Sequence, residues 1–353
     1  MSGHVLITGG AGFIGTNLAH RLLSQGETVL IYDNLSRAGV DQNLEWLRAL
    51  HGARLLVDVA DIRDRYALGA VLKNARQVYH LAAQVAVTKS IEDPGADFEI
   101  NARGTLNLLE AIRQIPDPPS VVFTSTNKVY GELADVALQR TGRRYEPANR
   151  TLRTTGIGEG RTLSFHSPYG CSKGTADQYV LDYARVYGIR AAVFRMSCIY
   201  GPHQFGTEDQ GWVAHFMLRA LDRETLTIYG DGMQVRDILF VEDLVDAFLL
   251  AQKNMDRISG RAFNVGGGPA NTVSLLELLE TIGEFNGAPP RVHFEHWRTA
   301  DQKYYVSDTR AFGAATAWRP RTGVREGTRK LWDWLIESRG MSVTRALTSR
   351  LAS

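Results

Sequence analysis

The chain has 353 residues, of which 44% are hydrophobic, so it can bury a large core in one large domain or two intermingled ones. Its 40 lysines and arginines nearly balance 38 aspartates and glutamates, which gives no reason to expect a nucleic-acid or membrane surface. Two cysteines cannot build a disulfide framework, and neither a signal peptide nor a long apolar run is present, so we expect a cytoplasmic protein.

A short β-rich run over 4–8 opens the chain, and a helical pattern with Ile14 and Leu18 on one face follows it. Between them residues 9–15 read G-G-A-G-F-I-G. A strand, a glycine turn and a helix in this order are typical of a dinucleotide-binding site. Glycines let the turn close and let backbone N–H groups approach a pyrophosphate. The alternative interpretation of residues 9–15 is an ordinary tight turn that binds no ligand.

A second strand, expected over 28–32, ends at Asp33. An acid at this position can accept hydrogen bonds from an adenosine ribose and would repel a 2′-phosphate, so it favours NAD over NADP. Arg37 weakens this inference slightly, because an arginine can accommodate that phosphate.

The alternation of strands and helices continues along the first half of the chain. Asp61 and Ile62 lie at the exit of one expected strand, where they could meet the adenine, and Ala82 and Ala83 leave room for a flat cofactor after another. This alternation predicts an α/β fold with a doubly wound parallel sheet of the Rossmann type, whose ligand site lies at the carboxyl ends of the strands. Further strands are expected over 54–57, 77–81, 121–124 and 189–194, with a helix over 100–112.

Tyr169 and Lys173 are four residues apart, so they share one helix face. A phenol has a free pKa of about 10, and a cation one turn away stabilises the phenolate and pulls that pKa toward neutrality. Thr126 could steady the same substrate oxygen with its hydroxyl. Together these groups can take a proton from an alcohol while a hydride leaves its carbon. The Tyr–Lys spacing also occurs by chance on surface helices.

Residues 131–166 interrupt the alternation with an Arg-, Thr- and Gly-rich stretch that lacks periodicity. We expect a lid over the active site there, with a disordered loop as the alternative. Trp212 is either a substrate contact or a core residue, and no Cys/His/Asp spacing predicts a metal site. The expected division is a nucleotide-binding domain over 1–195 and 236–258, a smaller discontinuous substrate domain over 196–235 and 259–335, and a loosely ordered polar tail over 336–353.

Several motifs, spread in order over roughly residues 5–335, resemble the extended short-chain dehydrogenase/reductase family of nucleotide-sugar enzymes. The matching segments are T-G-G-A-G-F-I-G (8–15), D-N-L-S-R (33–37), D-I-R-D (61–64), H-L-A-A-Q (80–84), the Tyr169/Lys173 pair and R-D-I-L-F-V-E-D (236–243). The resemblance implies tightly held NAD, a nucleoside diphosphate sugar as substrate, a keto intermediate and a homo-oligomeric assembly.

By position the resemblance makes Thr126 the catalytic hydroxyl, Tyr169 the base and Lys173 the residue that activates the phenol and contacts the nicotinamide ribose. Arg236 and Arg298 match arginines that clamp a diphosphate. The implied NAD contacts are Gly9, Gly12, Phe13, Ile14, Gly15, Asp33, Asn34, Ser36, Arg37, Asp61, Ile62, Leu81, Ala82, Ala83, Gln84, Thr124, Tyr169 and Lys173. The implied substrate contacts are Thr126, Asn127, Lys128, Gln210, Trp212, Arg236 and Arg298.

Three segments resemble the branch of the family that inverts C2 of a CDP-linked sugar: S-T-N-K-V-Y-G (125–131), F-H-S-P-Y-G-C-S-K-G (165–174) and D-Q-G-W-V (209–213). Cys198 stands where many 4-epimerases carry an asparagine, and Asn127 and Lys128 stand where dehydratases carry an Asp–Glu pair. We therefore expect an NAD-dependent 2-epimerase that works through a transient 2-keto sugar. The alternatives are a 4-epimerase or reductase on another nucleotide sugar, or a non-catalytic dinucleotide-sensing protein.

Overall fold

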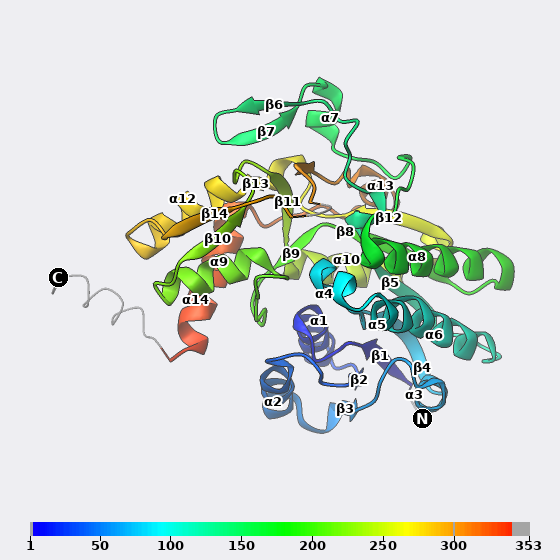
Figure 1. The fold of residues 1–353 in the computed structure, drawn as a ribbon. Helices are drawn as coiled ribbons and strands as arrows, with labels where there is room; N and C mark the ends of the chain where they lie inside the picture. The colour runs from blue at the N-terminus through cyan, green and yellow to red at the C-terminus, as the bar shows by residue number, and fades with distance from the viewer. Residues whose placement is uncertain (1–2, 299–300, 341–353) are drawn as a thin grey trace.

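The computed structural model describes residues 3–298 and 301–340, and its centre is a seven-stranded, fully parallel sheet with helices on both faces (Figure 1). The expected doubly wound fold is therefore confirmed. In sheet order the strands are β12 (Arg261–Val265), β8 (Ala191–Met196), β5 (Ser120–Thr126), β4 (Ala75–His80), β1 (His4–Thr8), β2 (Val29–Tyr32) and β3 (Leu55–Asp58).

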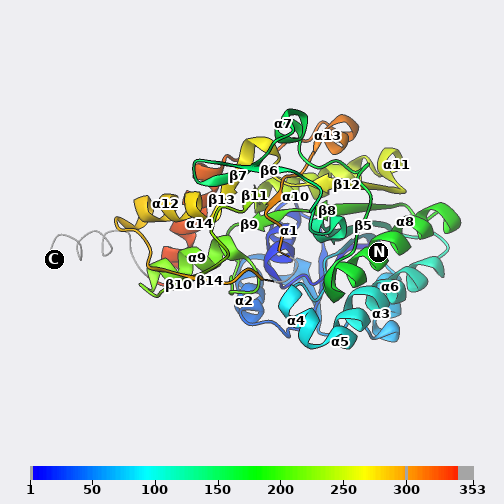
Figure 2. The same cartoon turned by 45° about the horizontal axis from the view of Figure 1, so that its top comes forward.

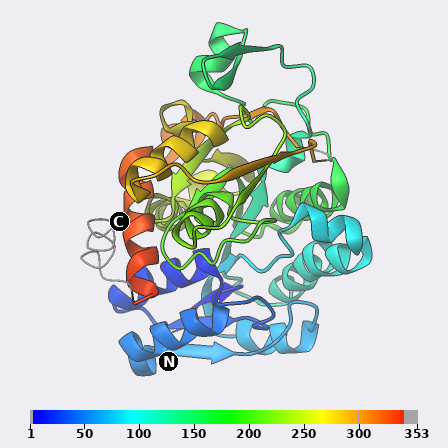
Figure 3. The same cartoon turned by 60° about the vertical axis from the view of Figure 1, so that its left-hand side comes forward.

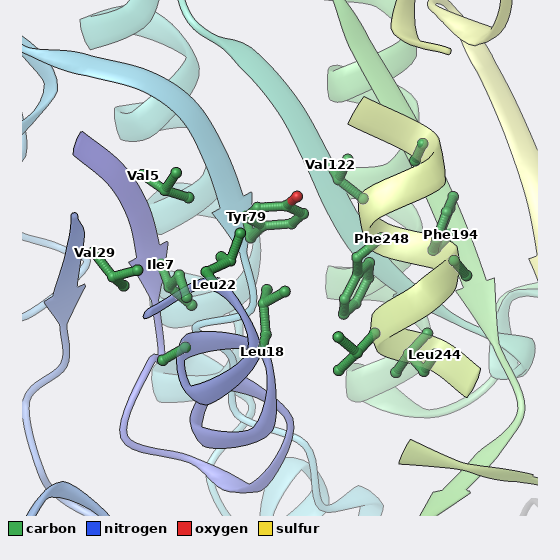
Figure 4. Close-up of a cluster of buried hydrophobic side chains, with 14 of the residues drawn as sticks. Val5, Ile7, Leu18, Leu22, Val29, Tyr79, Val122, Phe194, Leu244 and Phe248 are labelled. Carbon is green, nitrogen blue, oxygen red and sulfur yellow. The ribbon is translucent and has the colours of Figure 1, made fainter. Parts of the chain in front are cut away.

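Alternate residues of the central strands enter two separate cores, because successive side chains of a strand point to opposite faces. Val5 and Ile7 of β1 pack on one face against α1 (Phe13–Ser24) and α10 (Val241–Lys253), which contributes Phe248 (Figure 4). Leu6, between them in sequence, packs on the other face. Burial of each apolar side chain of this size contributes about 1.5–3 kcal/mol to the stability of the folded chain.

The second face of the sheet is covered by α3 (Arg65–Leu72), α6 (Gly104–Arg113) and α8 (Ser167–Tyr187). In Figure 2 these three helices lie together on the other side of β5 from α10. Two further short helices, α4 (Val87–Glu92) and α5 (Pro94–Phe98), pack against α8. The helix that carries Tyr169 and Lys173 is thus held between the sheet and several neighbours.

The smaller half is organised around β11 (Val235–Phe240), which pairs with the short strands β9 (Cys198–Tyr200), β13 (Thr272–Ser274) and β15 (Tyr304–Tyr305). A separate apolar cluster lies here and includes Phe240, Met217 and Trp332. The helices that cover it are α9 (Trp212–Leu221), α12 (Leu275–Asn286) and α14 (Val324–Ser338), beside the pair β10 (Leu226–Tyr229) and β14 (Val292–Glu295).

The expected boundaries between the two halves differ from the structure in two places. β11, at the start of the 236–258 segment assigned to the nucleotide-binding domain, belongs to the smaller sheet, and β12, assigned to the substrate domain, is an edge strand of the large one. The sequence of a short apolar strand does not show which sheet the strand joins, because its pairing partner lies far away in the chain. The helix α14 also continues past residue 335, and 341–353 lie outside the described residues.

Residues 131–166 form an ordered arm with a hairpin of β6 (Leu138–Thr141) and β7 (Arg144–Pro147) followed by α7 (Arg150–Thr155). The arm lies at the top of Figure 3, against the smaller half. Arg144 donates to both carboxylate oxygens of Glu277, at 2.6 and 2.8 Å, and Ile157 N donates to Val306 O at 2.7 Å. The disordered-loop alternative is therefore wrong, and the lid stays a prediction.

Across the described ranges 3–298 and 301–340, none of the helices combines the length and the apolar composition that crossing a membrane requires.

His80, the last residue of β4, generates a pH prediction. Its ring nitrogens lie 2.7 Å from Thr8 Oγ1 and 2.9 Å from Thr105 Oγ1, and burial lowers its pKa to about 3. An unfolded histidine titrates near pH 6.5, so the unfolded chain binds the extra proton as pH falls below that value. His80 therefore costs about 1.4 kcal/mol of stability per pH unit below pH 6.5.

As pH falls from 7 to 5, the parent chain should lose about 2 kcal/mol more unfolding free energy than His80→Gln does. Urea unfolding at the two pH values measures this difference. His296→Gln, the same substitution at an exposed position, is the matched control. Parallel pH profiles for the parent and His80→Gln would contradict the prediction.

Candidate active site

The turn between β1 and α1 is a close-packed cradle at the carboxyl end of the sheet. Gly9 has φ +70°, and a Cβ placed on it would lie 2.7 Å from Ala82 N. A Cβ on Gly15 would lie 2.5 Å from Gly9 O, so a side chain at either position would collide with backbone. Phe13 and Ile14 form the first turn of α1, whose amide groups point toward the cradle. This geometry fits the pyrophosphate of a dinucleotide.

Asp33 faces the cradle from the end of β2. Its carboxylate accepts hydrogen bonds from Ala11 N at 3.1 Å and Leu35 N at 2.9 Å. Burial raises the pKa of Asp33, while these backbone donors and the nearby Arg37 oppose the rise. Arg37 donates to the amide oxygen of Gln210. Gln210, which we expected at the substrate, therefore lies against the cofactor side of the site.

Asp61 and Asn34 form the adjacent edge of the cradle, with Asn34 Nδ2 donating to Asp61 Oδ2 at 2.9 Å. Ser36 N donates to Asn34 Oδ1 at 3.2 Å and orders the same loop. The side chain of Ile62 is buried, and a Cβ on Gly104 would lie 2.8 Å from it. Ile62 therefore packs beneath the site, and Asp61 presents the polar surface.

The loop after β4 runs beside the cradle. Leu81 N donates to Thr8 O at 3.0 Å, and Ala82 N donates to Thr8 Oγ1 at 3.3 Å. Ala83 follows, and then Gln84, which turns inward and donates through Nε2 to Asp97 Oδ1 at 2.8 Å. Ala82 and Ala83 are half-buried, consistent with a backbone wall along a flat ligand.

The three predicted catalytic side chains meet at the carboxyl end of β5. Thr126, the last residue of β5, is hydrogen-bonded to the Tyr169 side chain. Lys173 Nζ donates to Thr124 O at 2.6 Å and lies 4.3 Å from the centre of the Phe123 ring. Both Tyr169 and Lys173 are buried. The structure thus brings together a phenol, a hydroxyl and an ammonium group from two elements.

The expected effect of Lys173 on the phenol is not seen. Burial raises the pKa of Tyr169 to about 12, with the Thr126 hydrogen bond lowering it and Asp97 raising it further. Burial also lowers the pKa of Lys173 to about 7, while Asp177 and Asp97 raise it. The expectation was wrong because a shared helix face fixes spacing but not desolvation, and burial penalises both charged forms.

A polar network behind Tyr169 escaped sequence analysis. Ser172 Oγ donates to Asp97 Oδ2, and Asn101 Nδ2 lies 3.1 Å from both Asp97 Oδ1 and Ser172 Oγ. Asn101 belongs to a π-helical turn, Glu99–Arg103. Such turns often occur at functional sites. These residues come from separate elements, so no local spacing marks them.

Asp177 and Arg195 form a second buried group that was missed. Arg195 Nε and Nη2 each donate to the Asp177 carboxylate at 2.9 Å, and both side chains are almost fully buried. Asp177 is four residues after Lys173, so it lies one helical turn further on the same face. That spacing was the available signal for an acid near the lysine.

The other side of the site gathers charged groups around Asp301. Arg236 Nη2 donates to Asp301 Oδ1 at 2.8 Å, and Lys128 Nζ lies 4.0 Å from the same oxygen. Asn127 Nδ2 donates to Gln302 Oε1 at 3.1 Å. The predicted substrate residues Asn127, Lys128 and Arg236 therefore share one corner next to Thr126.

Trp212 and Arg298 lie at the edges of this corner. The Trp212 ring packs against the apolar cluster of the smaller half, and its Nε1 donates to Cys198 Sγ at 3.3 Å. Arg298 donates to Glu208 Oε1 at 2.8 Å, and its guanidinium lies 3.8 Å from the centre of the Tyr229 ring. Arg298 and Arg236 thus have different acidic partners.

A cavity of about 670 Å³ lies between Tyr130 and residues of the 131–166 arm, and Tyr169 is not among its lining residues. Its charged lining is paired, with Arg161 on Asp135 and His166 Nδ1 3.4 Å from Glu132. Over 3–298 and 301–340, no three His, Cys, Asp or Glu side chains are grouped so that they could hold a metal ion.

Comparison with known proteins identifies a family that this chain resembles. The model of the "NAD dependent epimerase/dehydratase family" matches residues 5–266. CDP-paratose 2-epimerase of Salmonella typhi is 42% identical over 337 residues, which cover 94% of this chain and 98% of that protein.

Two solved structures extend the comparison to bound molecules. UDP-glucuronic acid 4-epimerase from Bacillus cereus, in complex with UDP-glucuronic acid and NAD, has a TM-score of 0.82 and 25% identity, covering 95% of this chain and 99% of that one. dTDP-glucose 4,6-dehydratase from Streptomyces venezuelae, solved with NAD and TYD bound, has a TM-score of 0.82 and 28% identity, covering 96% and 98%.

The family match covers most of the chain, and the Salmonella typhi relative is similar over nearly its whole length. The expected resemblance to nucleotide-sugar enzymes and the expected use of NAD are thereby confirmed. The chain belongs to the NAD-dependent epimerase/dehydratase family.

Proposed function

We propose that this enzyme inverts C2 of a nucleoside diphosphate sugar, with a CDP-sugar favoured, through a transient 2-keto sugar. The observation that carries the proposal is the meeting of Thr126, Tyr169 and Lys173 beside the glycine cradle. The 42% identity to CDP-paratose 2-epimerase supports the choice of C2 and of cytidine.

The cradle around Gly9, Gly12 and Gly15 would hold the pyrophosphate of NAD, and Asp33 would accept hydrogen bonds from its adenosine ribose. Lys173 is the residue that would contact the nicotinamide ribose. When bound, NAD supplies an acceptor for a hydride from the sugar and a donor for its return.

Tyr169 would take the proton from the C2 hydroxyl, and Thr126 would hold the same oxygen. The phenol of the free protein is neutral, because burial raises its pKa to about 12. Lys173, one helical turn from Tyr169, is the cation that would offset a phenolate, and Asp177 and Asp97 favour its charged form. Tyr169 would return the proton when the ketone is reduced, so the residues end each cycle unchanged.

Inversion follows from the flat geometry of a ketone, which can receive hydride on either face. Oxidation at C2 makes this possible without an acidic C–H bond. Asn127 and Lys128 follow Thr126 directly, so no acid stands there to eliminate water. This argues against a dehydratase. A net reductase would consume added NAD(P)H, whereas an epimerase would not.

We expect Tyr169→Phe to lower kcat by about 10²–10⁴, the usual effect of losing a general acid–base group. NAD content and the thermal midpoint should stay close to those of the parent. Tyr179→Phe removes a phenol from an exposed position of the same helix and should leave kcat unchanged. Near-parental turnover by purified Tyr169→Phe would mean that another group is the base.

Substrate deuterated at C2 tests the position of the chemistry. The isotope should slow turnover and remain on C2 of the epimerised product, because the hydride returns to the carbon that it left. Proton abstraction would instead wash the label into water, which NMR would detect. An isotope effect seen with label at C4, and none with label at C2, would move the reaction to C4.

A further inference from the structure

Lys128 lies in a partly buried corner where two cations share the carboxylate of Asp301. Its ammonium is 4.0 Å from Asp301 Oδ1, and Arg236 donates to that same oxygen at 2.8 Å. The Lys128 side chain keeps 23% of its full exposure and that of Asp301 keeps 24%, so the corner remains open to a ligand. The backbone N–H of Lys128 donates to Thr126 Oγ1 at 3.2 Å, which fixes Lys128 beside the catalytic hydroxyl.

Other titratable groups of the described residues also lie around this corner. Burial raises the pKa of the Cys198 thiol, which therefore stays neutral. Asp237 is the neighbour of Arg236 on a strand, so it points to the opposite face, where Gly268 N donates to it at 3.0 Å. Glu132 also lies near Lys128, and its charge favours the protonated ammonium as that of Asp301 does.

The reaction proposed above brings an anion to this corner. C2 of the sugar is bonded directly to the anomeric carbon, which carries the diphosphate, whereas C4 lies across the ring. When C2 faces Tyr169 and Thr126, the sugar-linked phosphate must therefore lie close to Thr126. With C4 in that position, the phosphate would lie farther from Thr126.

We propose that Lys128 pairs with the phosphate attached to the anomeric carbon and is thereby the specificity-determining residue that presents C2 to Tyr169. This inference rests on the proposed function. Arg236 supplies a second positive charge to the same diphosphate, and Asp301 holds the two cations in place. Burial and Arg236 lower the pKa of Lys128 to about 8, so a bound phosphate would strengthen its protonated form.

Calorimetry with CDP and CMP tests the contact, because CMP lacks the terminal phosphate that corresponds to the sugar-linked one. Lys128→Met keeps the aliphatic stem and should weaken CDP binding about 10- to 100-fold, the usual effect of losing a hydrogen bond to a charged group. CMP binding should not change. Lys128→Arg should retain most of the CDP affinity, since it keeps the charge.

Lys89→Met is the matched control, because it removes the same charge from an exposed helix position. It should bind both nucleotides as the parent does. NAD content and thermal midpoint should be unchanged in every variant, which separates a lost contact from a lost fold. Equal weakening of CDP and CMP by Lys128→Met, or no weakening of either, would overturn the phosphate contact.

Substrates deuterated separately at C2 and C4 test the selection of carbon. Lys128→Met should lower kcat/KM for C2 inversion at least as much as it lowers CDP affinity. An unchanged kcat/KM for C2 inversion would overturn the selecting role while the proposed 2-epimerase stands. If the parent enzyme itself reacts at C4, the proposed function fails, and a CDP-specific loss in Lys128→Met would leave the phosphate contact standing without its role in choosing C2.

Discussion

The site depends on how one buried ammonium group is held at the carboxyl end of β5. Lys173 keeps 3% of its full exposure, and an unpaired charge buried to this degree would cost several kcal/mol. Its ammonium donates to Thr124 O at 2.6 Å, and the charges of Asp97 and Asp177 favour its protonated form. Both acids are themselves held in place, because Arg195 pairs with Asp177 and Ser172 donates a hydrogen bond to Asp97.

These partners tie the start of α8 to its surroundings. Asp97 comes from α5, Asn101 from the π-helical turn and Arg195 from β8, so three elements fix the position of one helix. Thr126 ends the strand beside it, which is why its hydroxyl meets Tyr169. The pKa values of the phenol and the ammonium are consequences of this enclosure and do not follow from their spacing alone.

The corner around Asp301 differs from the Tyr169 side of the site in how its charges are paired. On the Tyr169 side of the site buried acids and bases are matched, whereas Lys128 and Arg236 share the single carboxylate of Asp301. The 131–166 arm braces the smaller half that contains Arg236, through the pairing of Arg144 with Glu277. Two cations beside a neutral phenol and a hydroxyl suit a sugar whose reacting carbon is next to its diphosphate.

The sequence by itself determined the features that depend on neighbours in the chain. Strand, glycine turn, helix and Asp33 lie within about thirty residues, so local patterns predicted the cradle, and the family and the use of NAD were confirmed by comparison. The spacing of Tyr169 and Lys173 put both on one helix face. The tertiary structure decided which sheet received β11 and which received β12, because strand pairing depends on segments far away in the chain. It also brought Gln302 to Asn127, Asp301 to Arg236 and Gln210 to Arg37. It reversed the expected pKa direction of Tyr169, since desolvation is set by packing, which helical spacing does not encode.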